Sequence, residues 1–166
     1  MEFGGRYRFG ASRLKVWAAL NDAEVLKKTI PGCSHIAWLT DTTLEAAITV
    51  DLGVAKPTFK GDLEMIDVTP AETYTLAGRG KGGLLGLAHG SADVVLSDDG
   101  EDCILAFTAT AGASNAIMKI GKALIGSAAQ HIIDGFFRRF AAVMDVTLEV
   151  LPHDAAPESS PGVDPA

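Results

Sequence analysis

The sequence predicts an α+β fold, in which an antiparallel β-sheet packs against one long helix near the C-terminus. Three observations predict it: segments with alternating apolar and polar residues, short turn-forming connections between them, and one long segment with helical periodicity. The chain has 166 residues, of which 48% are hydrophobic, enough for one domain with a substantial core. We expect residues 1–150 to form that domain, because residues 151–166 have the acidic, proline-rich composition of a disordered tail.

The first part of the chain predicts one strand followed by two short helices. Residues 2–10 are β-like, and Ser12 is placed to cap a helix that ends near Leu20. A second short helix follows over residues 22–30, and the Pro31-Gly32 pair stops it.

The middle of the chain predicts a meander of six strands. In residues 58–67, for example, Phe59, Leu63 and Met65 alternate with charged residues, which is typical of a strand buried on one face. Short polar or glycine-containing turns separate the segments, and such connections favour antiparallel pairing. The expected strands are residues 33–39, 43–52, 58–67, 73–78, 87–96 and 103–111.

Residues 114–146 predict one continuous helix with an apolar face. Small residues recur along that face at every seventh position: Ser114, Gly121, Ala128, Gly135 and Ala142. They are flanked by Ile117, Met118, Leu124, Ile125 and Ile132. Glycine inside a helix costs about 1 kcal/mol relative to alanine, so the glycines on this face need a packing or functional explanation. Two hypotheses remain open: the helix backbone packs closely on a strand, or the missing volume holds an apolar ligand.

The loops at the two ends of the meander differ in chemistry. At one end they are ordinary polar turns, whereas the other end is rich in glycine and apolar residues. We expect those apolar loops to form a gate and a transient membrane contact, with the alternative that their leucines fold back into the core. The expected gate residues are Val54, Pro57, Gly82, Gly83, Leu84, Leu85 and Leu87.

The sequence offers little sign of catalytic or cofactor chemistry. The Gly-x-Gly-x-x-Gly pattern at residues 78–83 is followed by a strand-like segment instead of the helix that a dinucleotide site needs. The four histidines lack the spacing of metal ligands, and no nucleophile and base can be paired, so we expect no catalytic residue, metal or cofactor. A net charge of −7 argues against nucleic acid as partner. Without a signal peptide or an apolar run long enough to cross a membrane, we expect a cytoplasmic protein.

Several stretches together resemble the CoxG-like family of carbon monoxide dehydrogenase proteins, within the START/Bet v 1-like superfamily. They are VWAALND at 16–22, IPGC at 30–33, KPTFKG at 56–61, GRGKG at 78–82 and FFRRF at 136–140. The resemblance implies a helix-grip fold, in which a curved sheet wraps the last helix around an apolar cavity. It also implies a non-enzymatic accessory role to a molybdenum-containing dehydrogenase at the membrane, where the family is thought to recruit the enzyme or handle its quinone.

Strand alternation and the helix face give the expected cavity lining: Phe59, Leu63, Met65, Phe107, Ile117, Gly121, Leu124, Ile125 and Ala128. None of these side chains is ionisable. Together with what the resemblance implies, this lining favours a carrier for a quinone or lipid, peripheral to the inner face of the cell membrane. Two alternatives stay open: a polyketide cyclase-like or aromatase-like enzyme of the same fold, and an interaction adaptor without ligand.

Overall fold

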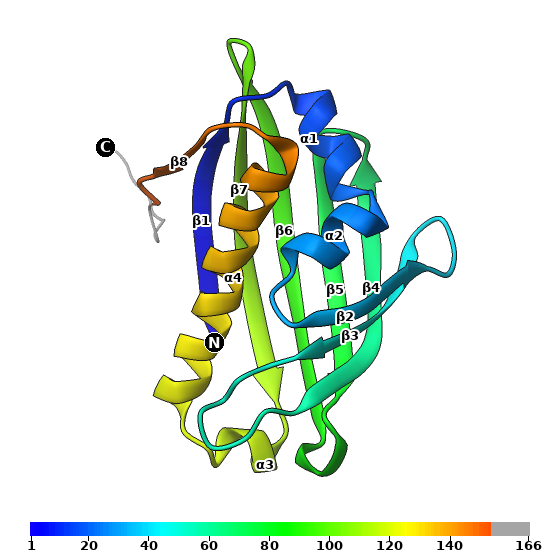
Figure 1. Ribbon diagram of the computed structural model, residues 1–166, viewed down its shortest axis with the longest axis vertical. Coiled ribbons are helices and arrows are strands. Elements are labelled where there is room, and N and C mark those ends of the chain that lie inside the picture. Colours follow the sequence, from blue (N-terminus) through cyan, green and yellow to red (C-terminus); the bar gives the residue numbers. More distant parts are fainter. Residues whose placement is uncertain (154–166) are drawn as a thin grey trace.

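The computed structural model describes residues 1–153, which form a curved antiparallel sheet of eight strands and a long C-terminal helix lying across its concave face (Figure 1). The strands are β1 (Glu2–Phe9), β2 (Cys33–Trp38), β3 (Thr43–Thr49), β4 (Thr58–Thr69), β5 (Thr73–Lys81), β6 (Leu87–Asp99), β7 (Asp102–Ala113) and β8 (Leu148–Leu151). The helices are α1 (Arg13–Leu20), α2 (Ala23–Thr29), α3 (Asn115–Met118) and α4 (Lys122–Met144), with a 3₁₀ turn η1 (Gly83–Leu85). This is the helix-grip fold that the resemblance implied.

The order of the strands explains how β1 and β8 are held. Over the described residues the sheet runs β2-β3-β4-β5-β6-β7-β1-β8, so the meander is continuous and β1 pairs with its last strand. The edge strand β8 pairs with β1 from Arg6 to Phe9 and was not expected from the sequence. It extends one residue beyond the expected domain boundary, and most of the expected tail, residues 154–166, lies outside the described residues.

The first two helices begin where their caps predict. The Ser12 hydroxyl accepts a hydrogen bond from the Lys15 backbone N–H, and Asp22 accepts from the Glu24 N–H at 2.9 Å. Gly32 follows α2 with a φ of +77°, and an added Cβ would lie 2.1 Å from the Thr49 carbonyl oxygen. Glycine is therefore required where the chain turns from α2 into β2.

The expected continuous helix over residues 114–146 is wrong. Ser114 caps the short helix α3, the chain leaves helical geometry, and α4 begins only after Gly121, whose φ is +122°. Only glycine adopts this conformation readily, so Gly121 separates two helices instead of lying inside one.

The seven-residue line of small residues does not form a groove. An added Cβ at Gly135 would lie 2.9 Å from Pro31 Cγ, so this glycine permits close packing of α4 on the end of α2. Ala142 is exposed, and the buried residues of α4 are Ile125, Gly135, Phe137, Phe140 and Ala141.

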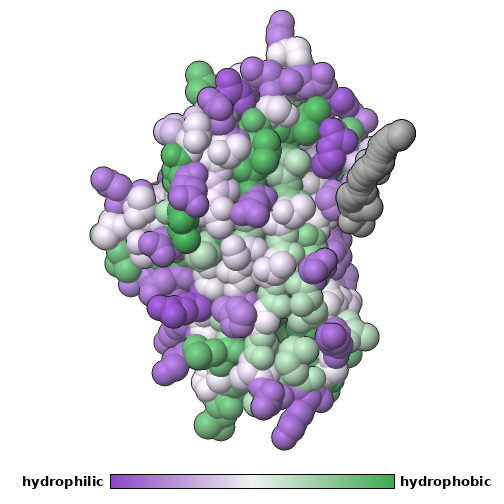
Figure 2. All heavy atoms as spheres, turned by 180° about the vertical axis from the view of Figure 1, so that it is seen from behind, coloured by the Kyte–Doolittle hydropathy of each residue, from purple (hydrophilic) through white to green (hydrophobic). Residues whose placement is uncertain are grey.

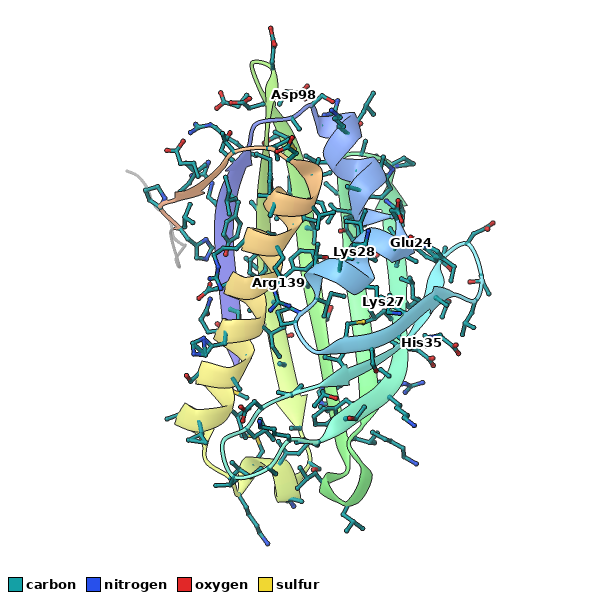
Figure 3. All side chains as sticks on the ribbon, viewed as in Figure 1. Glu24, Lys27, Lys28, His35, Asp98 and Arg139 are labelled. Atoms are coloured by element: carbon teal, nitrogen blue, oxygen red, sulfur yellow. The ribbon has the colours of Figure 1, made fainter. Side chains whose placement is uncertain are left out.

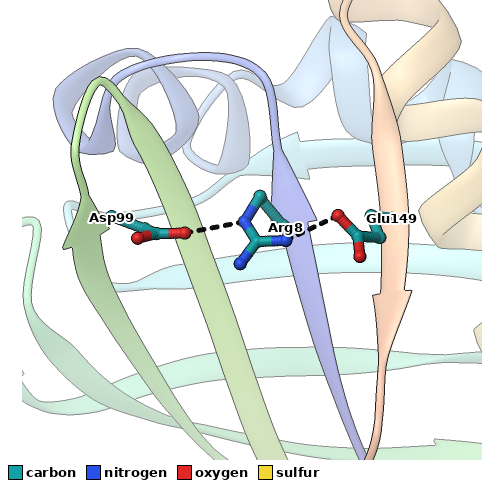
Figure 4. A network of polar contacts seen from close by, with 3 residues as sticks. All are labelled: Arg8, Asp99 and Glu149. Carbon is teal, nitrogen blue, oxygen red and sulfur yellow. Dashed lines mark hydrogen bonds and ion pairs between the residues drawn. The ribbon is translucent and has the colours of Figure 1, made fainter.

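Aromatic side chains fill the part of the core nearest the polar turns. Phe9 and Phe140 are fully buried, with ring centroids 5.5 Å apart, and Tyr7 stacks on Phe137 at 3.9 Å. On the outer face of β1, Arg8 bonds Asp99 at the end of β6 at 2.7 Å and Glu149 of β8 at 2.5 Å (Figure 4). Because these groups are solvated, the ion pairs orient β8 more than they stabilise the fold.

Candidate ligand-binding site

A cavity of about 430 Å³ lies between the concave face of the sheet and the first half of α4. This volume is within the range of about 300–1,000 Å³ usual for small-molecule sites. Three residues of α4 cover it: Ala129, Ile132 and Ile133. The sheet contributes Phe3 from β1 and inward-facing residues of β3 to β7, namely Ala46, Ile48, Phe59, Gly61, Leu63, Leu76, Gly78, Gly80, Ala88, Gly90, Ala92, Ala109 and Ala111.

Small residues on the sheet, and not on the helix, make the space. Cross-strand pairing places Gly78, Gly90 and Ala111 in one row across β5, β6 and β7. Two rows further toward the polar turns, the same strands present Tyr74, Val94 and Phe107, all buried. The sheet surface therefore changes from large side chains to almost none along the length of the strands, and α4 crosses above both regions.

Glycines on the cavity floor serve different purposes. An added Cβ at Gly61 would lie 1.8 Å from the Arg79 carbonyl oxygen, so the close approach of β4 and β5 requires glycine there. An added Cβ at Gly78 would lie nearest to the flexible end of the Leu63 side chain, 2.6 Å from its Cδ2. Gly61 thus permits the close approach of β4 and β5, whereas the alanines of β6 and β7 leave the cavity its depth.

The lining is almost entirely apolar. Asp62, Arg79 and His89 border the cavity through their strands, yet they are exposed and alternate with the inward-facing residues. An added Cβ at Gly112 would lie 2.8 Å from the His89 ring, so this imidazole covers its cross-strand partner on the convex face. Around the cavity, within residues 1–153, no acidic, basic or histidine side chain occupies an inward-facing strand position. The same residues contain no cluster of three potential metal ligands.

The structure brings together only part of the expected lining. Phe59 and Leu63 border the cavity. Met65 and Phe107 belong instead to the packed core, where Phe107 lies against Phe137 at 5.7 Å. Both residues lie on parts of their strands that extend beyond the cavity. Alternation alone cannot show where along a strand the cavity ends.

The expected lining residues on the helix lie elsewhere. Ile117 is buried in α3, and Gly121 lies in the break before α4. Leu124 is 43% exposed, Ile125 is buried and Ala128 is half-buried, and none of the three borders the cavity. Because α4 starts later and is rotated relative to the expected helix, Ala129, Ile132 and Ile133 take the expected place. The alternating alanines and glycines at 88, 90, 92, 109 and 111 were the missed signal in the sequence.

The expected gate loops do gather at one end of the molecule, at the bottom of Figure 1. Ser114, at the entry to α3, joins that entry to the β5–β6 loop, since its hydroxyl donates to the Leu85 carbonyl and its backbone N–H donates to the Leu87 carbonyl. Leu84 is fully exposed and Leu87 is 49% exposed, so these two do not fold back into the core. The other members vary: Val54 and Gly83 are exposed, Pro57 and Leu85 are half-buried and Gly82 is buried. Gating itself stays a prediction.

Solved structures with the same fold place the chain in a class. A conserved protein from Geobacillus kaustophilus is 22% identical, with a TM-score of 0.79 over 90% of this chain and 99% of that one. Ara h 8.0201 is 15% identical, with a TM-score of 0.63 over 87% and 97%. The Zhui aromatase/cyclase from Streptomyces sp. R1128 is 12% identical, with a TM-score of 0.65 over 87% and 93%. A search of curated protein sequences found no match.

The sheet, its helix and these neighbours define a protein with a Bet v 1-like helix-grip fold. Within that class, the sequence model of CoxG, the G subunit of carbon monoxide dehydrogenase, matches residues 5–144. The chain therefore belongs to the CoxG family. Over residues 1–153, no helix combines the length and the apolar character needed to cross a membrane.

Proposed function

We propose that the protein is a non-enzymatic carrier that holds a hydrophobic molecule, a quinone or a lipid, between the sheet and α4. The observation that carries this proposal is the small-residue floor of the cavity, where Gly78, Gly90 and Ala111 form one row below Ile132 and Ile133. An apolar ligand gains about 25 cal/mol for each Å² of apolar surface that it removes from water, and such a site offers it few competing polar contacts.

The partner in this proposal is a molybdenum carbon monoxide dehydrogenase-type enzyme. Its support is the family, which is named for a component of that enzyme. In this role the carrier links the enzyme to the membrane or to its quinone pool, and a hydrophobic electron acceptor needs protection from water on that path. Retention of the purified dehydrogenase on the immobilised protein tests the partner separately from the ligand.

An enzymatic role would need a polar group facing the bound molecule. The Zhui aromatase/cyclase shares the fold at 12% identity, which carries no argument about chemistry. The apolar lining described above supports a carrier over a cyclase, because within residues 1–153 no ionisable side chain at an inward-facing strand position near the floor could donate or accept a proton.

Thermal unfolding of lipid-stripped protein tests ligand binding. We expect ubiquinone or menaquinone analogues at about a hundred times their dissociation constant to stabilise the fold by about 2.7 kcal/mol, or about 5–10 °C for a domain of this size. The variant Ala111→Leu fills the floor and should lose most of this shift.

Ala106→Leu is the matched control, because Ala106 lies on the same strand β7 and faces the convex surface. It should retain the full shift. A flat response to quinones, fatty acids and phospholipids, or an equal loss in both variants, would contradict the carrier and favour an adaptor without ligand.

A further inference from the structure

A buried hydroxyl lies where the packed aromatic core meets the cavity. It belongs to Tyr7 on β1, which is 6% exposed. Along β1 the inward-facing residues are Phe3, which borders the cavity, then Gly5, and then Tyr7. The ring of Tyr7 is part of the packed core, and the cavity begins two positions beyond the residue next to it.

Two contacts fix the direction of the Tyr7 side chain. Its ring stacks on Phe137 of α4, with the ring centroids 3.9 Å apart. The ring also lies over Gly5, since an added Cβ there would be 2.9 Å from Tyr7 Cε2 and 3.0 Å from the hydroxyl oxygen. Any larger residue at position 5 would crowd the ring. Glycine at this position therefore lets the ring lie along β1, with its hydroxyl directed toward Phe3 and the cavity.

Packing alone does not explain a tyrosine at this position. A phenylalanine would make the same ring contacts with Phe107 and Phe137 and would bury no hydroxyl. Among residues 1–153, burial and the charge of Asp134 act on the Tyr7 hydroxyl, but no hydrogen bond does. A buried polar group without a partner costs free energy, and in a native protein it calls for an explanation. A polar atom of the bound molecule would supply the missing partner.

The Tyr7 hydroxyl is suited to donate a hydrogen bond and not to transfer a proton. Burial raises the pKa of Tyr7 above its usual 10.0, and the Asp134 carboxylate on α4 raises it further. Tyr7 therefore keeps its proton at neutral pH. Asp134 is itself exposed, and its carboxylate accepts a hydrogen bond from Gln130 Nε2 at 2.9 Å. A donor that stays protonated agrees with a carrier that performs no chemistry.

Most other polar side chains lie where water reaches them. Figure 2 shows many hydrophilic side chains on the convex face of the sheet. Figure 3 places Glu24 and Lys28 on α2 and Asp98 at the β6–β7 turn. Tyr7 differs, because its hydroxyl lies on the concave side, between the sheet and α4. A polar group at one end of an otherwise apolar site fixes the orientation of the ligand.

We propose, as a deepening of the carrier function on which it rests, that the Tyr7 hydroxyl donates a hydrogen bond to a carbonyl oxygen of the bound molecule. The ligand is then a ring ketone or quinone whose carbonyl leads into the cavity. An acyl lipid fits less well, because its chain leads with an apolar methyl end that leaves the hydroxyl without a partner. The apolar remainder of the ring lies over the floor formed by Gly78, Gly90 and Ala111.

Calorimetric titration of lipid-stripped protein with two matched ligands tests this role. The ligand 2-methyl-1,4-naphthoquinone carries carbonyl groups, and 2-methylnaphthalene has the same carbon skeleton without oxygen. We expect Tyr7→Phe to weaken quinone binding about five- to tenfold, as for the loss of one hydrogen bond, and to change hydrocarbon binding less than about twofold. The infrared carbonyl band of the bound quinone should lie at lower wavenumber in the unaltered protein than in Tyr7→Phe. A change in packing alone would not move this band.

Tyr74→Phe is the matched control, because it also removes a buried hydroxyl of the core. Tyr74 packs against Trp17 of α1, with ring centroids 5.3 Å apart, and does not border the cavity. This variant should bind both ligands like the unaltered protein. Equal losses for quinone and hydrocarbon in Tyr7→Phe, or an unchanged carbonyl band, would overturn the role of Tyr7. If Tyr7→Phe binds both ligands as well as the unaltered protein does, the role of Tyr7 is wrong and the carrier function stands. If neither ligand binds the unaltered protein, both proposals fail.

Discussion

The concave face of the sheet has two halves made by the same strands but filled in opposite ways. Near the polar turns, Tyr74, Val94 and Phe107 face the aromatic residues of α4. Toward the glycine-rich loops at the other end, Gly78, Gly90 and Ala111 face Ile132 and Ile133 across a cavity of about 430 Å³. The first half therefore supplies most of the stability, and the second keeps space open at the cost of packing contacts.

The largest expected effect lies in the packed half. Phe140 is fully buried and contacts the rings of Phe9 and Phe136. Phe140→Ala should lower the free energy of unfolding by about 3–5 kcal/mol, because it removes apolar contacts and leaves a void. Urea unfolding measures this, and a loss below about 1 kcal/mol would mean that the packed half is not the stabilising one.

Enlarging an alanine should distinguish the two halves directly. Ala141 is buried in the packed core, so Ala141→Leu should destabilise by about 1–3 kcal/mol through overpacking. Ala111→Leu enters the hollow half and should cost less than about 1 kcal/mol. Equal costs in urea unfolding would show that the cavity is closed in solution.

Substitutions at two glycines near the start of α4 extend the comparison to the helix. Gly121→Ala should destabilise by about 1–2 kcal/mol, because an L residue is strained at the φ of +122° even though an added Cβ would meet open space. Gly126→Ala, inside the helix with only Met1 Sδ at 3.9 Å, should stabilise by about 0.5–1 kcal/mol. Thermal unfolding of both variants shows whether each substitution raises or lowers stability. Destabilisation by both would place Gly126, too, at a close contact.

The substitution with the smallest expected effect on stability at neutral pH removes a buried hydroxyl of the packed half. Burial raises the pKa of Tyr74 from 10.0 to about 12. The unfolded chain then loses this proton first as pH rises, so stability is complete below about pH 10 and declines toward pH 12. Burial likewise raises the pKa of Cys103 to about 11.

Tyr74→Phe should therefore match the unaltered protein at pH 8 and lose less stability between pH 10 and 12. Unfolding in urea at several pH values checks this. Because phenylalanine keeps the aromatic ring, the substitution itself controls for packing. The same alkaline loss in both proteins would indicate that Tyr74 is accessible to water. The floor of the hollow half has no inward-facing ionisable side chain within residues 1–153 and should add no such dependence.

Much of the fold could be predicted because its signals are local. Alternation identified six meander strands and the inward-facing character of Phe59 and Leu63, and Ser12 and Asp22 marked the starts of two helices. The glycine-rich loops were expected at one end, and they lie there. A period of two along a strand, or a capping hydroxyl before a helix, depends only on neighbouring residues, so the sequence by itself determined these features.

Tertiary structure alone decided where the space lies. The seven-residue spacing left two hypotheses open, close packing of the helix or a space for a ligand, because the φ of Gly121 and the contact of Gly135 with Pro31 depend on how separate segments meet. Likewise, alternation shows that Gly90 and Phe107 face inward but not that strand register places one over a cavity and the other in a packed core. Register, helix rotation and the pairing of β8 with β1 are set by contacts between residues far apart in the chain, which no local pattern encodes.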